Sequence, residues 1–253
     1  MSTIDTTASN NGRGSEAWSE SWTHLSVQRR SPSYCRVTFD HSPINTITAT
    51  TVAELAELVC LIESDPDLNV VVFDSANPDF YLAHYDTEHD PRRTAALGHG
   101  PTGMHAWLDL LVRLSRAPVV SIASIRGRVR GAGSEFVLAC DLRFAARENA
   151  LLGHFGVGTS VVPGGGPMAR LSRLVGRGRA LEILLVAEDL DGPRAERYGY
   201  VNRVFADDQL DDEVEAIASR LARFDHHAIA RTKSYVDRVS LPADSDLEAI
   251  PDA

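Results

Sequence analysis

The sequence predicts an α/β protein in which strands and helices alternate along the chain. Short β-branched apolar runs, such as Val70–Asp74 and Val119–Ile125, have the composition of buried strands. The segments between them carry apolar residues at helical spacing, as Thr51–Ile62 does. Few tight hairpin turns are present, so an α/β architecture is favoured.

The first part of the chain begins with two strands around a turn and continues with a helix. Asp65-Pro66 ends this helix, because a residue before proline is pushed out of the helical conformation. In chain order we expect strands at His24–Gln28 and Tyr34–Phe39 around a turn at Arg29–Ser33, a helix at Thr51–Ile62 and a strand at Val70–Asp74.

The remainder repeats this alternation, with glycine-rich turns at Gly127–Gly133 and Gly164–Gly166. Helices are expected at Met104–Leu114, Ser134–Cys140, Pro167–Leu174, Ala180–Ala187, Ala195–Tyr198 and Leu210–Phe224. Strands are expected at Val119–Ile125, Leu142–Ala145 and Val201–Phe205.

Charge and cysteine usage limit the classes of partner. The formal net charge of −10 argues against a nucleic acid or an anionic membrane as partner, because both require a positive surface. Lys233 is the only lysine among the 25 basic residues. Three widely spaced cysteines, Cys35, Cys60 and Cys140, support neither a disulfide framework nor a metal site and indicate a reducing compartment.

The two ends of the sequence differ from its middle. Residues 1–17 are polar and predict a disordered tail, and the acidic segment Pro242–Ala253 is expected to be only partly ordered. The first 20 residues contain no apolar signal-peptide core, and no 18-residue apolar run occurs. We therefore expect a cytoplasmic protein.

Gly127–Gly133 is the first candidate site. Its small residues, placed between a strand and a helix, either allow close packing or let the backbone N–H groups approach an anion or a developing oxyanion. Glu135 follows on the first helical turn, where a carboxylate either only complements the helix dipole or faces a substrate.

A polar loop after the strand at Val70–Asp74 is the second candidate. It contains His84, Tyr85 and Asp86, followed by Glu88 and His89, which is either a functional loop or an ordinary solvated one. The His84-x4-His89 spacing does not imply a metal site, and His154 alone is more typical of a structural histidine. No GxSxG motif supports a serine hydrolase.

Taken in order, five segments between about Trp22 and Val239 resemble the crotonase (enoyl-CoA hydratase/isomerase) superfamily. Their order and spacing are far more specific than any one glycine motif. The segments are SPINTITATTVAEL, VVVFDSANPDFYLAHYD, APVVSIASIRGRVRGAGSEFVLACDLRFAA, VVPGGGPMARLSRLVGRGRALEILL and AERYGYVNRVF.

The resemblance implies a crotonase-like spiral of ββα units with a C-terminal helical region, assembled as a homotrimer or a dimer of trimers. It divides the chain into the tail at 1–17, a spiral core at 18–200 and a helical, oligomerisation region at 201–253 that looks shortened. It also implies an acyl-CoA substrate. The usual lysine contact with CoA near the C-terminus is in doubt, since only Lys233 is available.

By the same resemblance, the backbone N–H groups of His84 and Ala132 form the oxyanion hole and Glu135 is the acid/base. The second glutamate of the hydratases falls at Gly156, so that carboxylate is missing. Tyr85, Asp86, His154 and the His84 imidazole are the auxiliary candidates, although the sequence does not place their side chains. Neither a metal nor a separate cofactor is implied, since CoA enters as part of the substrate.

Three functions stay open at this point. The leading one is an enoyl-CoA hydratase-like lyase that acts through an enolate. The second is a crotonase-type C–C hydrolase of a β-diketone or a β-ketoacyl compound, suggested by the histidine at position 84. The third is a non-catalytic CoA-ester-binding protein, suggested by Gly156 and the shortened C-terminal region.

Overall fold

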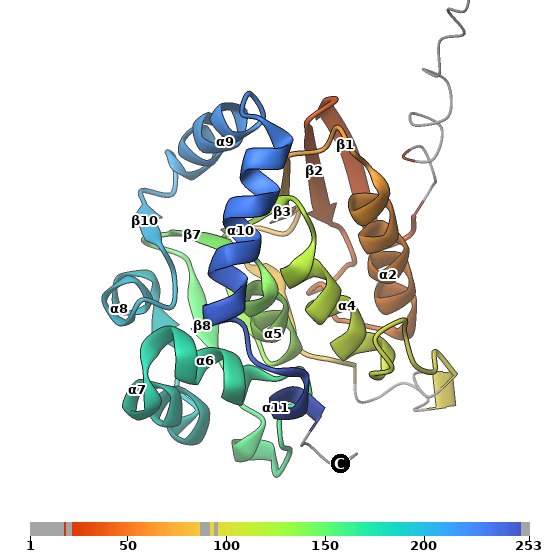
Figure 1. Cartoon of the computed structure of the whole chain (residues 1–253). Coiled ribbons are helices and arrows are strands. Elements are labelled where there is room, and N and C mark those ends of the chain that lie inside the picture. Colours follow the sequence, from red (N-terminus) through yellow and green to blue (C-terminus); the bar gives the residue numbers. More distant parts are fainter. Residues whose placement is uncertain (1–17, 19–21, 87–91, 94–95, 249–253) are drawn as a thin grey trace, which may run out of the picture.

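Two β-sheets organise the computed structural model, which describes Trp18 and residues 22–86, 92–93 and 96–248 (Figure 1). The six-stranded sheet has the order β1-β2-β3-β5-β7-β10, and the four-stranded sheet has the order β4-β6-β8-β9. The strands are β1 (Leu25–Ser31), β2 (Tyr34–Phe39), β3 (Val70–Ser75), β4 (Phe80–Leu82), β5 (Val120–Ile125), β6 (Arg128–Arg130), β7 (Leu142–Ala146), β8 (Leu151–Gly153), β9 (Leu190–Asp191) and β10 (Arg203–Phe205).

The middle of the chain winds through three successive ββα units. Each unit places one strand in the larger sheet, the next in the smaller sheet and then a helix: β3, β4 and α4 (Ala106–Arg116); β5, β6 and α5 (Ala132–Ala139); β7, β8 and α6 (Pro167–Val175). Strands β3, β5 and β7 are parallel, as are β4, β6 and β8. The predicted α/β spiral of ββα units is therefore confirmed.

Helices cover both faces of the larger sheet. Val70 and Val72 of β3 pack with α9 (Leu210–Leu221), whereas Val71 and Phe73, which point to the opposite face, join the main core with α2 (Ala49–Ser64). Inside that core the ring of Phe136 stands edge-on to Phe73, with ring centroids 5.0 Å apart. Because Phe136 follows Glu135, this packing fixes the start of α5 against the sheet.

The remaining helical segments lie mostly after the third unit. They are η2 (Val157–Thr159), α7 (Arg177–Leu181), the π-helical η3 (Glu182–Val186), α8 (Gly192–Tyr198), α10 (His226–Ser240) and α11 (Asp244–Glu248). The helix expected over Ala180–Ala187 is thus an α-helix that widens into a π-helical turn.

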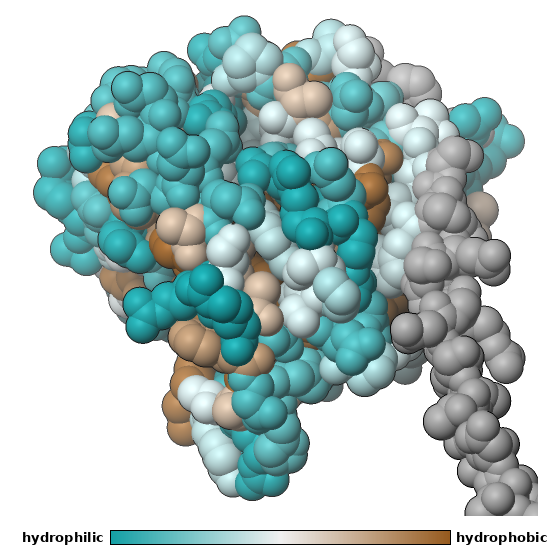
Figure 2. All heavy atoms as spheres, turned by 90° about the horizontal axis from the view of Figure 1, so that it is seen from above, coloured by the Kyte–Doolittle hydropathy of each residue, from teal (hydrophilic) through white to brown (hydrophobic). Residues whose placement is uncertain are grey.

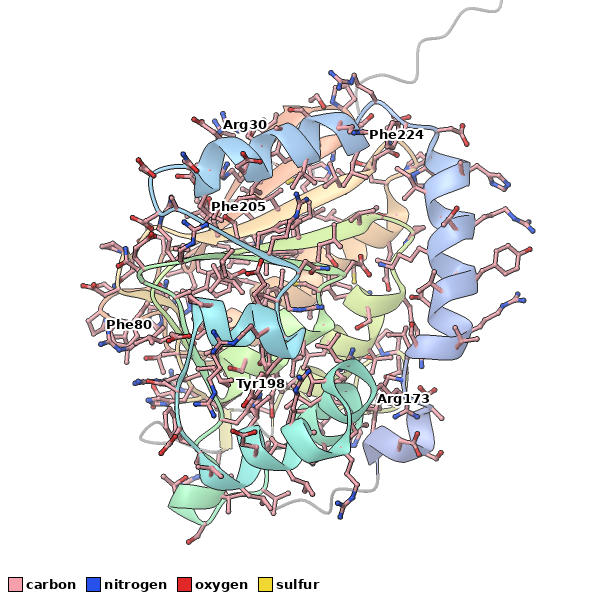
Figure 3. The ribbon with its side chains drawn as sticks, turned by 90° about the vertical axis from the view of Figure 1, so that its left-hand side faces the viewer. Arg30, Phe80, Arg173, Tyr198, Phe205 and Phe224 are labelled. Carbon is pink, nitrogen blue, oxygen red and sulfur yellow. The ribbon has the colours of Figure 1, made fainter. Side chains whose placement is uncertain are left out.

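Helix α10 lies at one edge of the molecule, with side chains that project away from the rest (Figure 3). Lys233 attaches it in the middle, since its ammonium donates to the Val119 carbonyl at 2.9 Å and to Asp141 Oδ2 at 2.7 Å, and at its first residue His226 Nδ1 lies 3.1 Å from the Leu68 carbonyl oxygen. The Lys233 side chain is 9% exposed. The only lysine of the chain is thus committed to joining α10 to the larger sheet.

The described part of the acidic C-terminal segment ends in the short helix α11. Leu247 of α11 is 2% exposed and packs with Met104, Leu108 and Val112 in a small apolar cluster. Asp244 and Asp246 of α11 also pair with Arg116 and Arg173, so apolar packing and ion pairs together anchor this acidic segment. The predicted tail at 1–17 and residues 249–253 lie outside the described residues, and the predicted domain limits stay predictions.

The surface seen from above is mainly hydrophilic, with smaller hydrophobic areas (Figure 2). Exposed large apolar side chains gather in two segments, 157–162 and 185–186, and on α10. Among the described residues, no helix combines the length and the apolar character that crossing a membrane requires.

Candidate active site

Glu135 is a buried carboxyl group held by two N–H donors. Trp107 Nε1 of α4 donates to Oε2 at 2.8 Å, and the backbone N–H of Gly165 donates to Oε1 at 2.9 Å. A Cβ atom built on Gly165 would lie 2.2 Å from Glu135 Oε2, so only glycine leaves room for this contact. The carboxyl group is thus fixed from α4, α5 and the turn before α6.

The environment of Glu135 favours reversible protonation. Burial raises the pKa of the carboxyl group, because removal from water penalises the charged form. The hydrogen bonds from Trp107 and Gly165 and the positive charge of Arg170 oppose this increase in pKa. A group balanced in this way can act as a general acid or base.

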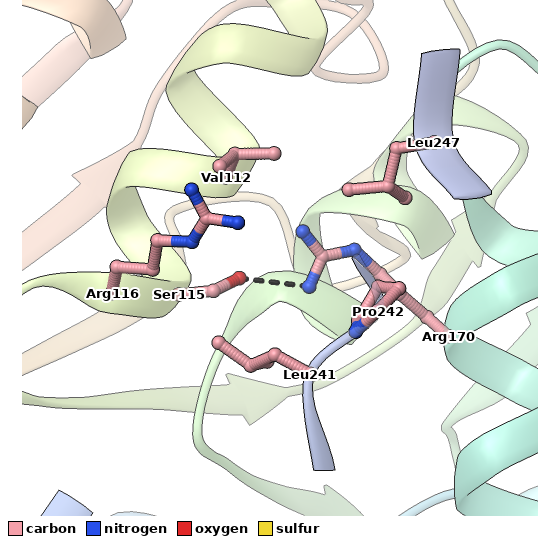
Figure 4. Close-up of a pocket in the computed structure, with 7 residues that line it drawn as sticks. All are labelled: Val112, Ser115, Arg116, Arg170, Leu241, Pro242 and Leu247. Atoms are coloured by element: carbon pink, nitrogen blue, oxygen red, sulfur yellow. Dashed lines mark hydrogen bonds between the residues drawn. The ribbon is translucent and has the colours of Figure 1, made fainter. Parts of the chain in front are cut away.

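Arg170 joins two of the elements that surround Glu135 (Figure 4). The residue is 7% exposed, and its Nη1 donates to Ser115 Oγ at 2.8 Å. Arg170 belongs to α6, just after Gly165, and Ser115 belongs to α4, which also carries Trp107. The bond therefore ties α6 to α4, the helix that carries the donor Trp107. It lies beside a small pocket that is also lined by Leu241, Pro242 and Leu247.

Two backbone segments cross close to the start of α5. Gly133 N–H donates to the Ala83 carbonyl at 3.1 Å, and a Cβ atom on Gly133 would lie 2.1 Å from the Leu82 oxygen. The crossing places the N–H groups of His84 and Ala132 on adjoining segments. Neither donates a hydrogen bond within the part of the chain that the structure describes. Two such donors can stabilise an oxyanion.

The loop from Asn45 to Ile47 fixes the His84 segment. The Asn45 carbonyl accepts from Ala83 N at 3.0 Å, Ile47 N donates to the His84 carbonyl at 3.2 Å, and Asp86 N donates to the Ile47 carbonyl at 2.8 Å. Asn45 adopts a left-handed conformation with φ of 53°, and its buried side chain donates to Ser75 Oγ at 2.8 Å. This loop positions the N–H of His84 without contributing a charged group.

The auxiliary candidates lie in different surroundings. Tyr85 is half-buried, and its ring meets the Trp107 ring edge-on at a centroid distance of 6.5 Å, so the structure brings Tyr85 close to a donor of Glu135. Asp86 is half-buried on the same segment. Glu88 and His89 lie outside the described residues.

His154 is a buried histidine after β8. It is 1% exposed, and its Nε2 lies 3.4 Å from the Tyr200 hydroxyl. Burial lowers the pKa of His154 to about 4, so the ring is neutral at pH 7. The described residues show no bond between His154 and either Glu135 or His84.

Gly156 occupies the position at which the hydratases of the family are expected to carry a second glutamate. The surrounding backbone is too close for a side chain in its present position. A Cβ atom on Gly156 would lie 2.8 Å from the Val161 carbonyl oxygen and 3.2 Å from Pro163 Cγ. Any side chain here requires the 161–163 segment to shift. The position therefore carries no side chain, and the backbone around it is closely packed.

The sequence points to Glu135, His84 and Ala132 as candidate site residues, and these stay predictions, but it does not point to the residues that hold them in place. Trp107, Gly165, Arg170 and Asn45 were not singled out. A tryptophan in an amphipathic helix, such as Trp107, has the pattern of a core residue. A glycine in a glycine-rich turn, such as Gly165, has the pattern of a loop residue, so the local sequence marks neither as a partner of Glu135.

Comparison with known proteins places these features in a family. The model described as enoyl-CoA hydratase/isomerase matches residues 29–249. Crotonyl-CoA hydratase of Syntrophomonas wolfei is 30% identical over 193 residues, which are 76% of this chain and 72% of that protein. Human mitochondrial methylglutaconyl-CoA hydratase is 29% identical over 180 residues, 71% of this chain and 52% of that protein.

Solved structures agree on the fold. A protein from Streptomyces avermitilis described as an enoyl-CoA hydratase has a TM-score of 0.83 at 42% identity, covering 90% of this chain and 82% of that one. Pseudomonas aeruginosa DspI has a TM-score of 0.78 at 26% identity, covering 88% of this chain and 89% of that one.

Proposed function

The chain belongs to the enoyl-CoA hydratase/isomerase family of the crotonase superfamily, and we propose that it is an enzyme acting on an acyl-CoA thioester through an enolate. The proposal rests on the N–H groups of His84 and Ala132, which have no acceptor among the described residues, and on the buried carboxyl group of Glu135, which lies on the same helix as Ala132. An enolate needs both features, since its oxygen gains charge while a carbon atom gains or loses a proton.

The geometry supports one proposed role for each of these groups. The thioester oxygen accepts hydrogen bonds from His84 N–H and Ala132 N–H, which strengthen as negative charge develops on it. Glu135 exchanges a proton with the substrate, and burial, which raises its pKa, favours the protonated form more than in an exposed carboxyl group. CoA enters as part of the substrate, and these steps require no metal, flavin or nicotinamide.

Hydration of an enoyl-CoA, or its reversal, is the reaction we favour. The relatives named as hydratases support this choice, although Gly156 departs from a two-carboxylate site. The test is turnover of short enoyl-CoA thioesters by the wild type and by Glu135→Gln, which keeps the shape of the side chain but carries no exchangeable carboxyl proton.

Loss of a positioned acid/base lowers kcat by about 10²–10⁴-fold. We expect that loss in Glu135→Gln, together with unchanged binding of a saturated acyl-CoA. An active wild type whose rate Glu135→Gln leaves intact would reject the role of Glu135. A wild type inactive on every enoyl thioester would reject hydration.

A second reaction is favoured by the exposed imidazole at His84, beside the donor pair. In it, the site cleaves a C–C bond of a β-diketone or β-ketoacyl compound by adding water to a carbonyl and expelling an enolate. Product analysis with a panel of diketones and ketoacyl thioesters distinguishes it from hydration. Binding of CoA esters without turnover of either panel would instead indicate a non-catalytic family member.

A further inference from the structure

Hydration across a double bond needs one group to take a proton from water and another to protonate carbon. Glu135 supplies one such group, and the crowded backbone at Gly156 prevents the other from standing there. His154 is a poor replacement, because its ring is buried, neutral and directed to the Tyr200 hydroxyl. The segment that carries the His84 N–H offers another group that can accept a proton, the His84 imidazole.

The His84 imidazole has a defined tautomer. Its Nδ1 lies 2.8 Å from the Tyr85 carbonyl oxygen, which can only accept a hydrogen bond, so Nδ1 carries the proton. In the neutral ring the lone pair therefore lies on Nε2. Nε2 has no hydrogen-bond partner among the described residues, and the side chain is exposed.

The same residue carries one of the two oxyanion donors, which keeps the ring near the acyl group. The His84 carbonyl is fixed by Ile47 N–H at 3.2 Å, so the backbone that bears the ring is held in place. A Cβ atom on Gly131 would lie 3.4 Å from His84 Cβ, which places the ring root beside the entry to α5. A glycine at 131 leaves that side of His84 uncrowded.

We propose that Nε2 of His84 is the second acid/base of the site, in place of the carboxylate missing at Gly156; this rests on the proposed function. Nε2 takes a proton from water as the water oxygen bonds to the β-carbon. The π electrons move to the thioester oxygen, where His84 N–H and Ala132 N–H stabilise the enolate. Protonated Glu135 then gives its proton to the α-carbon, and the imidazolium proton returns to Glu135 through solvent. One water molecule is added in total.

His84→Asn and His84→Ala test this assignment with crotonyl-CoA as the probe. Asparagine can still donate to the Tyr85 carbonyl through its amide but has no basic nitrogen, and both variants keep the backbone N–H. We expect kcat to fall by about 10²–10⁴-fold in both. The Kd for butyryl-CoA is expected to stay within a few-fold of the wild type. Added imidazole should restore part of the rate of His84→Ala.

The matched control is His227→Ala, which removes an exposed histidine on α10 and should change neither quantity. Wild-type kcat in His84→Asn would overturn the assignment, and so would a loss of rate in His84→Ala that imidazole does not restore. Both outcomes leave an active wild type and thus the proposed function intact. A wild type that binds butyryl-CoA but hydrates no enoyl-CoA thioester overturns hydration and the assignment of His84 together.

Discussion

Two neighbouring parts of the site are built in opposite ways. The carboxyl group of Glu135 is buried, and donors from α4 and from the turn before α6 hold both of its oxygens. The loop at 156–162 folds on itself instead, with Val161 N–H bonded to the Gly156 carbonyl at 2.8 Å and with Val157 and Val162 exposed. The surroundings of Glu135 are therefore more tightly constrained than the 156–162 loop. A substitution of a given size should lower activity or stability more beside Glu135 than in the loop.

Gly165→Ala should show the largest effect. The added methyl group would lie 2.2 Å from Glu135 Oε2 and must displace the carboxyl group. A displacement of about 1 Å can cost about 10²-fold in rate, and we expect kcat to fall by at least that much. Gly164→Ala is the matched control, since no atom lies within 4 Å of its added carbon. Equal rates in the two variants would contradict the claim that Glu135 needs this close approach.

The buried ring of His154, just before the 156–162 loop, should make the free energy of unfolding depend on pH. Burial lowers its pKa from 6.5 to about 4, so folding favours the neutral ring. This contribution is complete above pH 6.5 and is lost as the pH falls towards 4, by about 3 kcal/mol. Denaturant unfolding at pH 7 and pH 4 should show this loss in the wild type and less of it in His154→Phe. His227→Ala should behave as the wild type does.

Trp107→Phe tests one donor of Glu135 while keeping an aromatic ring. Loss of the Nε1–H bond should raise the pKa of Glu135 further, because that bond favours the anion. The rate should fall about tenfold, as expected for a hydrogen bond to a charged group. The limb of the pH–rate profile that reports Glu135 should move to higher pH. Trp22→Phe, which removes a surface bond to Glu57 at 3.3 Å, should leave the profile in place.

Gly156→Ala should show the smallest effect. Its methyl group would lie 2.8 Å from the Val161 carbonyl, so the loop must adjust at a cost of about 1 kcal/mol in the free energy of unfolding. Gly158→Ala is the control, because its nearest contact is the Ala187 methyl group at 4.0 Å. Denaturant unfolding should separate the two variants. A cost as large as that of Gly165→Ala would mean that both sides of the site are equally rigid.

The sequence predicts the alternation of strands and helices well, because long apolar runs and helical spacing are local signals. It does not reveal the short strands β4, β6, β8 and β9, which have two or three residues each. These strands form the smaller sheet, and β4 leads into the segment that bears the His84 N–H. Their existence depends on pairing between residues that are 23 to 48 positions apart in sequence, such as Arg128 with Leu151 and Phe80 with Arg128.

The same distinction between local signals and long-range contacts applies to the candidate site. Glu135 and Gly131–Gly133 stand together in sequence, so their arrangement could be inferred from one stretch. The contacts that surround Glu135 join residues 28 and 30 positions away. Neither Trp107 nor Gly165 has a composition or spacing that marks it as a partner of a carboxyl group, so only the folded chain reveals them.

The attachment of α10 has a chemical consequence of its own. Thioesters acylate free amines, and the proposed substrates are thioesters. Lys233 is the only ε-amine in the sequence, and its ammonium is shielded and paired with Asp141. Because a thioester must reach the nitrogen to acylate it, the lysine that joins α10 to the sheet is also sterically protected from acylation. Amine-directed labels and crosslinkers should accordingly report on the detachment of α10.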